Sequence, residues 1–276
     1  MVAAVTTDLV SEVQRRHDLS PTATAAVGRL LTGAVLLGAN LGTRERISLQ
    51  ISGNGPIGTL VADAWLVDEG TIGARGYARN GRVELPINAR GKFDVAGALG
   101  AGSLQVTKSY EVGQPYVGVV PLQTGEIAED LAAYLARSEQ NPSVVALGVL
   151  ADPRGVVAAG GVLARMLPGT SEAQLASLER RARAMPPVTS IIAENPDAQA
   201  LLAHLLDDVG AAQSANVAFA CSCTKAKAET LLRGLGREEL ERMHEERERT
   251  EATCEFCRRS YTFTRAELRA IAEDLE

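Results

Sequence analysis

Four cysteines, arranged as two tight pairs near the end of the chain, are the residues of this sequence best suited to chemistry. Residues 221–223 read "CSC" and residues 254–257 read "CEFC", and the 276 residues contain four cysteines in all. Two closely spaced pairs brought together by an intervening fold commonly supply the four soft ligands that Zn²⁺ prefers. We therefore predict that one zinc ion is bound by Cys221, Cys223, Cys254 and Cys257.

This pattern is compatible with more than one use of the metal. A permanent structural zinc is its commoner meaning, and a thiol switch is the less common one. A structural zinc in a small peptide contributes about 10 to 16 kcal/mol at neutral pH, so oxidation of the ligands would unfold the module. The spacing alone leaves both readings open.

Two other functions of paired cysteines are less favoured. A thioredoxin-type oxidoreductase would place its Cys-x-x-Cys between a strand and a long helix, and "CEFC" lacks that setting. A zinc-ribbon nucleic-acid binder would need a basic surface. Residues 221–276 carry 11 basic and 13 acidic side chains, a net charge of −2, and this sign does not suit binding to phosphates.

Cations and histidines close to the cysteines complete the candidate site. Four thiolates around Zn²⁺ leave a formal charge of −2, which neighbouring Lys and Arg side chains can offset. His244 lies between the two pairs, but four thiolates already complete a tetrahedron, so we predict a solvated histidine there. His204 lies in an apolar helical pattern and is predicted to be partly buried. The candidate cations are Lys225, Lys227, Arg258 and Arg259.

Composition indicates a globular protein of the cytoplasm. Hydrophobic residues make up 46% of the chain and aromatic residues 4%, with 26 glycines, and the net charge is −6. The negative charge argues against wholesale binding to nucleic acid or to an anionic membrane. The N-terminus lacks the pattern of a signal peptide, and no apolar run approaches the roughly 20 residues of a membrane-spanning helix. Because structural disulfides are rare in the cytoplasm, metal or redox roles for the cysteines are favoured.

The elements expected before the cysteines form an α+β core over residues 1–168. Ser20 and Pro21 begin a helix that is apolar on all sides, which indicates burial. Short alternating or β-branched runs separated by Gly, Pro, Asn and Asp then predict antiparallel strands and hairpins. A helix is expected in "GEIAEDLAAYLARSEQ". The predicted strands are "RISLQIS", "GTLVADAW", "TIGARGYAR", "GSLQVTKSY", "PYVGVVPL", "SVVALGVLA" and "GVVAAGGVLARML".

Two further parts follow this core. Residues 169–219 contain amphipathic patterns, so we predict a helical linker whose apolar faces pack on the preceding sheet. Residues 220–276 form a small cysteine-containing domain with charged helical segments as far as Thr250 and a strand at "YTF". In this domain Thr264 and Glu267 form a capping box that opens the last helix.

No pattern in the chain predicts catalysis. "GNGPIG" at 53–58 matches Gly-x-Gly-x-x-Gly, but it stands between two predicted strands and does not open a helix, so a hairpin turn is favoured over a dinucleotide site. Neither a hydrolase triad nor a phosphate-binding loop is evident. We therefore expect a protein without enzymatic activity, catalytic residues or an organic cofactor.

The two cysteine pairs and several other segments of the chain resemble the redox-regulated 33 kDa chaperonin family of heat-shock holdases. Its zinc module has the pattern Cys-x-Cys, a spacer of about thirty residues, and Cys-x-x-Cys. The likeness covers nearly the whole chain, although position 258 is Arg where we would expect Gly. The other similar segments, in the order of the family, are "SPTATAAVGRLLTGAVLLGANL", "QISGNGPIGTLVADA", "GSLQVTKSY", "PYVGVVPLQTGEIAEDLAAYLARSEQNPSVVALGV" and "CEFCRRSYTFT".

The resemblance implies an ATP-independent chaperone controlled by oxidation. The reduced, zinc-bound state would be a poor chaperone. Oxidants would join Cys221 to Cys223 and Cys254 to Cys257 by disulfides and release the zinc. The zinc domain and the linker would then lose structure, unfolding client proteins would bind to the exposed apolar surface, and the active form would be a homodimer.

Overall fold

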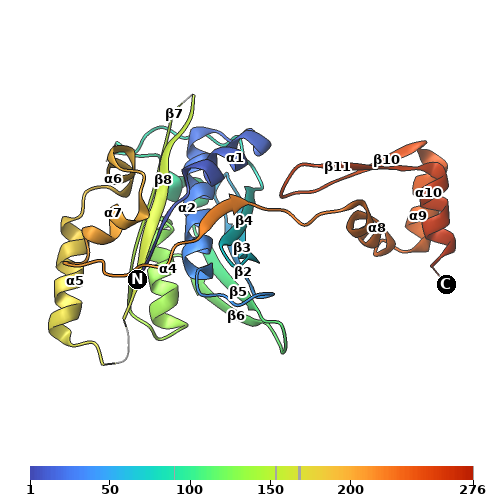
Figure 1. Cartoon of the computed structure of the whole chain (residues 1–276). Coiled ribbons are helices and arrows are strands. Elements are labelled where there is room, and N and C mark those ends of the chain that lie inside the picture. The colour runs from blue at the N-terminus through green and yellow to red at the C-terminus, as the bar shows by residue number, and fades with distance from the viewer. Residues whose placement is uncertain (90, 153, 167–168, 276) are drawn as a thin grey trace. The chain divides into compact units, whose positions relative to one another are not determined.

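The computed structural model describes residues 1–89, 91–152, 154–166 and 169–275. The chain divides into two compact units, Met1–Ala220 and Cys221–Glu276 (Figure 1). Both units contain helices and strands, so the fold is mixed α+β as predicted. The boundary that the sequence suggested at Pro168 lies outside the described residues.

A long helix, α2 (Pro21–Gly38), forms the centre of the first unit. Its first turn is capped by Ser20, whose side chain accepts a hydrogen bond from the backbone N–H of Ala23. The helix contacts strands of two different sheets, one on each side. It is therefore buried from Thr22 to Gly38, and this explains why its sequence is apolar on all sides.

A six-stranded sheet lies on one side of α2. Its strand order is β6-β5-β2-β3-β4-β9, and all neighbours are antiparallel except β4 and β9. The predicted strands from "RISLQIS" to "PYVGVVPL" are confirmed, and "GNGPIG" links β2 to β3 as a hairpin turn. The strands are β2 (Arg46–Gly53), β3 (Thr59–Asp68), β4 (Thr71–Ala78), β5 (Gly102–Ser109), β6 (Tyr116–Pro121) and β9 (Asn216–Phe219).

A three-stranded antiparallel sheet of order β1-β8-β7 lies on the other side of α2. Both predicted strands are confirmed in β7 and β8, and the predicted helix before them is shorter than expected, as α4. The sequence did not predict β1 or the short helix α3. The bounds are β1 (Val2–Val5), α1 (Thr7–His17), α3 (Val95–Leu99), α4 (Ala128–Arg137), β7 (Ser143–Asp152) and β8 (Gly155–Arg165).

Helices α5 (Glu172–Ala184), α6 (Val188–Glu194) and α7 (Ala198–Ala203) cover the outer face of this second sheet (Figure 1). Strand β8 is buried on both faces: Ala159 and Leu163 belong to the core around α2, whereas Ala158 and Val162 pack under the helices. The packing of this predicted linker on the sheet is confirmed. A Cβ at Gly160 would lie 2.4 Å from Cδ1 of Ile192, so glycine permits the close approach of α6.

The prediction of a purely helical segment over 169–219 is wrong at its end. Asn216 to Phe219 form β9, which pairs in parallel with β4. The strand is only four residues long and its partner lies far away in the sequence. A local pattern therefore could not predict this pairing. His204 is also not partly buried, because it caps the C-terminus of α7 as an exposed residue.

The second unit consists of three helices and a β-hairpin within its described residues. The predicted capping box is confirmed, with the side chains of Thr264 and Glu267 each accepting from the other's backbone N–H. The helical segment expected as far as Thr250 is too long. It ends earlier, and the strand β10 follows. The elements are α8 (Lys225–Arg233), α9 (Arg237–Glu246), β10 (Arg249–Thr253), β11 (Ser260–Thr264) and α10 (Arg265–Glu273).

Candidate metal centre

The four cysteines occupy two loops of the second unit. Cys221 and Cys223 precede α8, and Cys254 and Cys257 lie in the turn that joins β10 to β11. This turn is closed by two backbone hydrogen bonds, from Cys254 N to Arg259 O and from Arg258 N to Cys254 O, each 2.9 Å long. The hairpin and α8 therefore present the two cysteine pairs to each other.

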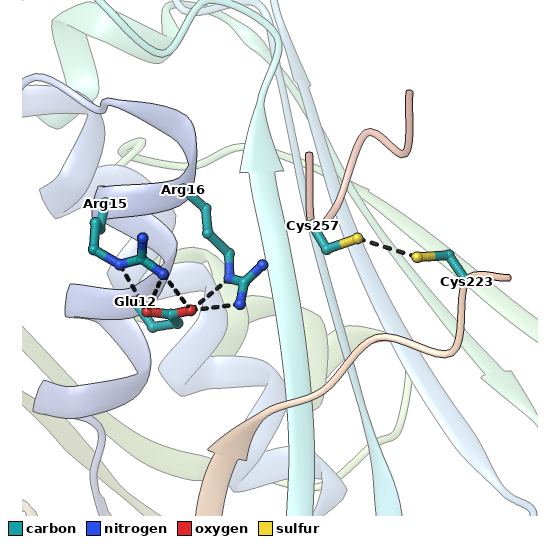
Figure 2. Close-up of polar contacts among 5 residues, drawn as sticks. All are labelled: Glu12, Arg15, Arg16, Cys223 and Cys257. Carbon is teal, nitrogen blue, oxygen red and sulfur yellow. Dashed lines mark hydrogen bonds and ion pairs between the residues drawn. The ribbon is translucent and has the colours of Figure 1, made fainter. Parts of the chain in front are cut away.

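The sulfur atoms form one cluster. All four Sγ atoms lie within 4.8 Å of one another, and the cysteines are not joined by disulfides in this structure. The Sγ atoms of Cys221 and Cys254 are 3.8 Å apart, and those of Cys223 and Cys257 are 3.1 Å apart (Figure 2). Zn–S bonds of about 2.3 Å in a tetrahedron would separate the sulfurs by about 3.8 Å. The cluster can therefore hold a metal ion, and its size and donor set fit zinc.

Neighbouring groups fix the two loops. The Nζ of Lys227 in α8 donates to the carbonyl oxygen of Ser222 at 2.7 Å and contacts its hydroxyl at 3.0 Å. The hydroxyl of Tyr261 in β11 donates to Sγ of Cys223 at 3.3 Å. Each loop is thus tied to the regular element beside it.

The thiols differ in their acidity. Burial raises the pKa of Cys223, but hydrogen bonds from Tyr261 and Cys257 outweigh this effect and bring the pKa to about 7. Burial, with the hydrogen bond to Cys223, raises the pKa of Cys257 to about 12. A proton shared between these two sulfurs explains why the values move apart.

The cations predicted near the cysteines have different partners. The hydrogen bond with Tyr261 and the charges of Cys223 and Cys257 raise the pKa of Arg259, which places its guanidinium in the field of the cluster. Lys225 instead pairs with Glu267 at 2.6 Å, and this contact, with hydrogen bonds from Thr264, lowers the pKa of Glu267 to about 2. Arg258 lies 3.4 Å from Glu255.

Position 258 is Arg where the family pattern led us to expect Gly, and the backbone at this position has a conformation that suits glycine. Its φ is 59°, in the left-handed region that glycine adopts without strain. The turn thus has the conformation that a glycine would favour, and Arg258 adopts it with a Cβ.

His244 was considered as a metal ligand from its place in the sequence, and Tyr261, which contacts the cluster, was not considered. His244 is not among the residues whose ligand atoms gather at the site. Tyr261 was missed, because only the hairpin register, which pairs it with Ala252, brings a tyrosine four positions after the last cysteine back to the first loop. The one feature of the sequence that could have pointed to Tyr261 is that it is an aromatic residue in a chain with few aromatic residues.

Little apolar burial supports the second unit. Among its described residues, the core cluster consists of seven buried side chains, of which Phe263, Leu240 and Leu268 are almost inaccessible to solvent. Such a small core gives limited stability. A metal that joins two loops would therefore supply a large share of the stability of this unit.

Fold and site together define an α+β protein with a separate four-cysteine module. The chain belongs to the Hsp33 protein family, whose sequence model matches residues 1–264. This match confirms the resemblance to the 33 kDa chaperonin family that was inferred from the sequence. Within the part of the chain that the structure describes, no helix combines the length and the apolar character needed to cross a membrane.

Relatives match over almost their full length. A 33 kDa chaperonin of Geobacter sulfurreducens is 42% identical over 278 residues, which cover 99% of this chain and 91% of the relative. A 33 kDa chaperonin of Bacillus velezensis is 38% identical over 275 residues, covering 99% and 93%. The crystal structure of the 33 kDa chaperonin (heat shock protein 33 homolog) from Thermotoga maritima has a TM-score of 0.89 and 38% identity, covering 97% of this chain and 91% of that chain.

Proposed function

We propose that this chain is a redox-regulated, ATP-independent chaperone that holds unfolding proteins and prevents their aggregation. The observation that carries the proposal is the cluster of four thiols in a unit with a small apolar core. Its context is a chain of the Hsp33 family, whose relatives are named 33 kDa chaperonin. The activity would reside in the cytoplasm and would need neither catalytic residues nor an organic cofactor.

The proposed organisation has three parts. Residues 1–168 form the chaperone core, residues 169–219 are a linker, and residues 220–276 form a zinc domain that acts as the switch. One Zn²⁺ would be held by Cys221, Cys223, Cys254 and Cys257 in the reduced, inactive state. The separation of the four sulfurs, within 4.8 Å of one another, supports this ligand set.

The activating step is a four-electron oxidation. Each pair of thiolates loses two electrons and forms one S–S bond, giving Cys221–Cys223 and Cys254–Cys257. Two equivalents of a peroxide accept these electrons, their O–O bonds break, and water forms after proton uptake. The sulfurs no longer offer four thiolate ligands, so Zn²⁺ leaves, and the unit loses the metal's contribution to folding.

Which cysteines are paired by disulfides decides whether the module unfolds. Bonds within each pair would close only short loops and would leave the two loops unconnected to each other. A bond between Cys223 and Cys257, whose sulfurs are 3.1 Å apart, would instead connect the loops and preserve the fold. Unfolding of the module therefore requires pairing within each motif, and peptide mapping of the oxidised chain by mass spectrometry distinguishes the two patterns.

Loss of structure would expose surface for clients. The linker buries Ile192, Leu201 and Leu205 against the second sheet. If the linker loosened after zinc loss, these side chains and those of the sheet beneath would form an apolar surface able to bind unfolded chains. The oxidised form would act as a homodimer, and neither nucleic acid nor membrane would be a partner.

Mild peroxide treatment of the zinc-loaded full chain tests this function. We expect release of one Zn²⁺ per chain, loss of protected amides within residues 221–275, and co-elution of the oxidised protein with an unfolded client on size exclusion. A permanent structural zinc predicts retention of the metal and the same client binding before and after treatment. That result would contradict the proposed switch.

A further inference from the structure

Strand β9 is the last element of the first unit and occupies the outer edge of β4. It pairs with β4 in parallel over four residues, from Thr71 with Asn216 to Ala74 with Phe219. The backbone N–H of Asn216 donates to Gly70 O at 2.7 Å, and that of Ala220 donates to Ala74 O at 3.0 Å. The metal-site residue Cys221 follows immediately in the sequence. The pairing is short, and it uses backbone groups that any extended chain possesses.

The side chains of β9 follow a simple pattern. Val217 and Phe219 are partly buried against the core of the first unit, whereas Asn216 and Ala218 are exposed. The guanidinium of Arg16 in α1 lies over the ring of Phe219, 4.3 Å from its centroid. Glu12 holds this guanidinium by an ion pair of 2.6 Å (Figure 2). Strand β9 therefore places an aliphatic and an aromatic side chain, two positions apart, at the edge of β4. The aromatic ring lies beneath a cation.

A groove extends beside the Val217 position. Its volume is about 450 Å³, and Val217 forms part of its wall. The size falls in the range of sites that bind small ligands or single side chains. Because Val217 does not fill this space, a larger apolar side chain at the same position would bury more surface. The other lining residues are Val5, Thr7, Asp8, Leu9, Val157, Ile192, Ala193 and Pro196.

We propose that the edge of β4, together with Arg16 and this groove, is a binding site for extended segments of unfolded proteins that carry an aliphatic and an aromatic residue at positions i and i+2. In the state described here β9 occupies the site as an internal substitute. A client segment would replace it by adding a strand to the sheet, a mode in which backbone hydrogen bonds give affinity and alternate side chains give selectivity.

The release of β9 on oxidation rests on the proposed function, but the binding site itself does not. A parallel pairing of four residues contributes few hydrogen bonds, and β9 is an edge strand with no further strand beyond it among the described residues. We therefore expect β9 to be released when the unit that follows it in the sequence unfolds. Substitution within β9 can open the site without any oxidant, which separates the two proposals.

The first test compares two variants of the reduced, zinc-loaded full chain. Ala218→Pro removes the amide hydrogen at the centre of β9, whereas Ala218→Ser keeps it and changes only an exposed side chain. The probe is a fluorescent peptide that copies residues 214–220, SANVAFA. We expect it to bind Ala218→Pro at least about tenfold more tightly than Ala218→Ser, because the competing internal strand is lost. A copy with Asp at the Val217 and Phe219 positions should not bind.

The second test locates the site by hydrogen exchange and does not depend on that variant. Because the carbonyls of Gly70 and Ala74 face β9, strand alternation turns the amides of Ile72 and Ala74 to the same edge. In oxidised wild type these two amides should exchange faster, and the bound peptide should slow them at least about tenfold. Arg16→Gln should weaken peptide binding about two- to tenfold. The matched change Arg15→Gln, on the other cation paired with Glu12, should leave it unchanged.

The outcomes distinguish this inference from the proposed function. Clients that bind the oxidised protein without slowing the Ile72 and Ala74 amides would overturn the β4 site and leave the holdase proposal intact. Peptide binding to Ala218→Pro with slowed amides, combined with no client binding after oxidation, would support the site and remove the redox switch. Equal peptide affinity for Ala218→Pro and Ala218→Ser, with fast exchange at Ile72 in the first, would also overturn the site.

Discussion

The two units of this chain are stabilised in different ways. In Met1–Ala220, α2 lies between two sheets and forms the centre of a large apolar core. In the described part of the second unit, residues 221–275, seven buried residues form the core beside a cluster of four sulfurs. A core of that size seldom supplies more than about 3 to 5 kcal/mol, whereas a structural zinc contributes about 10 to 16 kcal/mol. The first unit therefore depends on burial, whereas a metal held by the four thiols would supply most of the stability of the second.

Because the two units differ in this way, a chemical signal can act on one part of the molecule alone. Oxidation of thiols removes metal ligands but leaves buried Ala, Val, Leu and Ile side chains unchanged. A chain built in this way can lose the structure of the second unit while the first stays folded. Changes to the metal site and to either core should therefore have separate effects on the two units.

Zinc removal should have the largest effect. Treating the reduced chain with a strong chelator should unfold residues 221–275, since about 10 to 16 kcal/mol of metal binding is lost. Hydrogen exchange should show loss of protection in α8, α9 and α10, while α2 keeps its protection. Equal protection of both units after complete zinc removal would contradict the contrast.

Leu201→Asp should loosen the linker without touching the metal. Leu201 is fully buried against Ala158 and Ile192, and its loss alone would cost about 2 to 5 kcal/mol before the burial of a carboxylate is added. We expect new protease cleavage in 169–219 and partial holdase activity in the reduced state. Ala203→Asp, at an exposed position of α7, is the matched control. An inactive Leu201→Asp variant with unchanged cleavage would argue against the docked linker as the restraint.

Leu30→Ala should weaken the first unit alone. Leu30 lies in α2 and is inaccessible to solvent, so its truncation should lower the free energy of unfolding of Met1–Ala220 by about 2 to 5 kcal/mol. Thermal denaturation measures this loss, and a colorimetric chelator measures zinc affinity. We expect the affinity to stay at the wild-type value. A large fall in zinc affinity would show that the stabilities of the two units are coupled.

Phe263→Leu should lower the zinc affinity because it destabilises the fold of the second unit. Phe263 is 1% exposed in the small core, and a shape change of this kind costs about 1 to 1.5 kcal/mol. Because folding and metal binding are linked, zinc affinity should fall about five- to tenfold. Leu231→Ala, at a side chain that is 77% exposed, is the control and should leave the affinity unchanged. The same affinity for Phe263→Leu and wild type would mean that the ligand loops fold independently of this core.

Arg258→Gly should have the smallest effect, and it should be stabilising. The left-handed φ of 59° strains a residue with a Cβ by about 1 to 2 kcal/mol, and the flexibility of glycine in the unfolded chain offsets about half of this. We expect up to about fivefold tighter zinc binding. Arg258→Ala keeps the Cβ and should show no gain. Equal gains in both variants would trace the effect to the lost charge.

The sequence predicted those features that depend on neighbouring residues. The apolar surround of α2, the alternation in β2, β5 and β6 and the capping box at Thr264 are local patterns, and all are present in the structure. The proximity of the four cysteines was predicted because their spacing has few uses other than metal binding. In each case the physical cause lies within a few residues.

The features that were missed depend on distant partners. Strand β9 forms because it pairs with the edge of β4, and β10 pairs with β11 although a helix was expected as far as Thr250. Tyr261 reaches Cys223 across 38 positions in the sequence. Register and turn geometry decide these contacts, and no local pattern records them.

Aggregation of an unfolded client shows whether the four cysteines act as a switch. A chemically unfolded client is diluted into buffer, and its aggregation is followed by light scattering with the full chain added either reduced and zinc-loaded or oxidised and zinc-free. We predict that only the oxidised form suppresses scattering. Equal suppression by both forms, or by neither, would show that oxidation of the cysteines does not control chaperone activity.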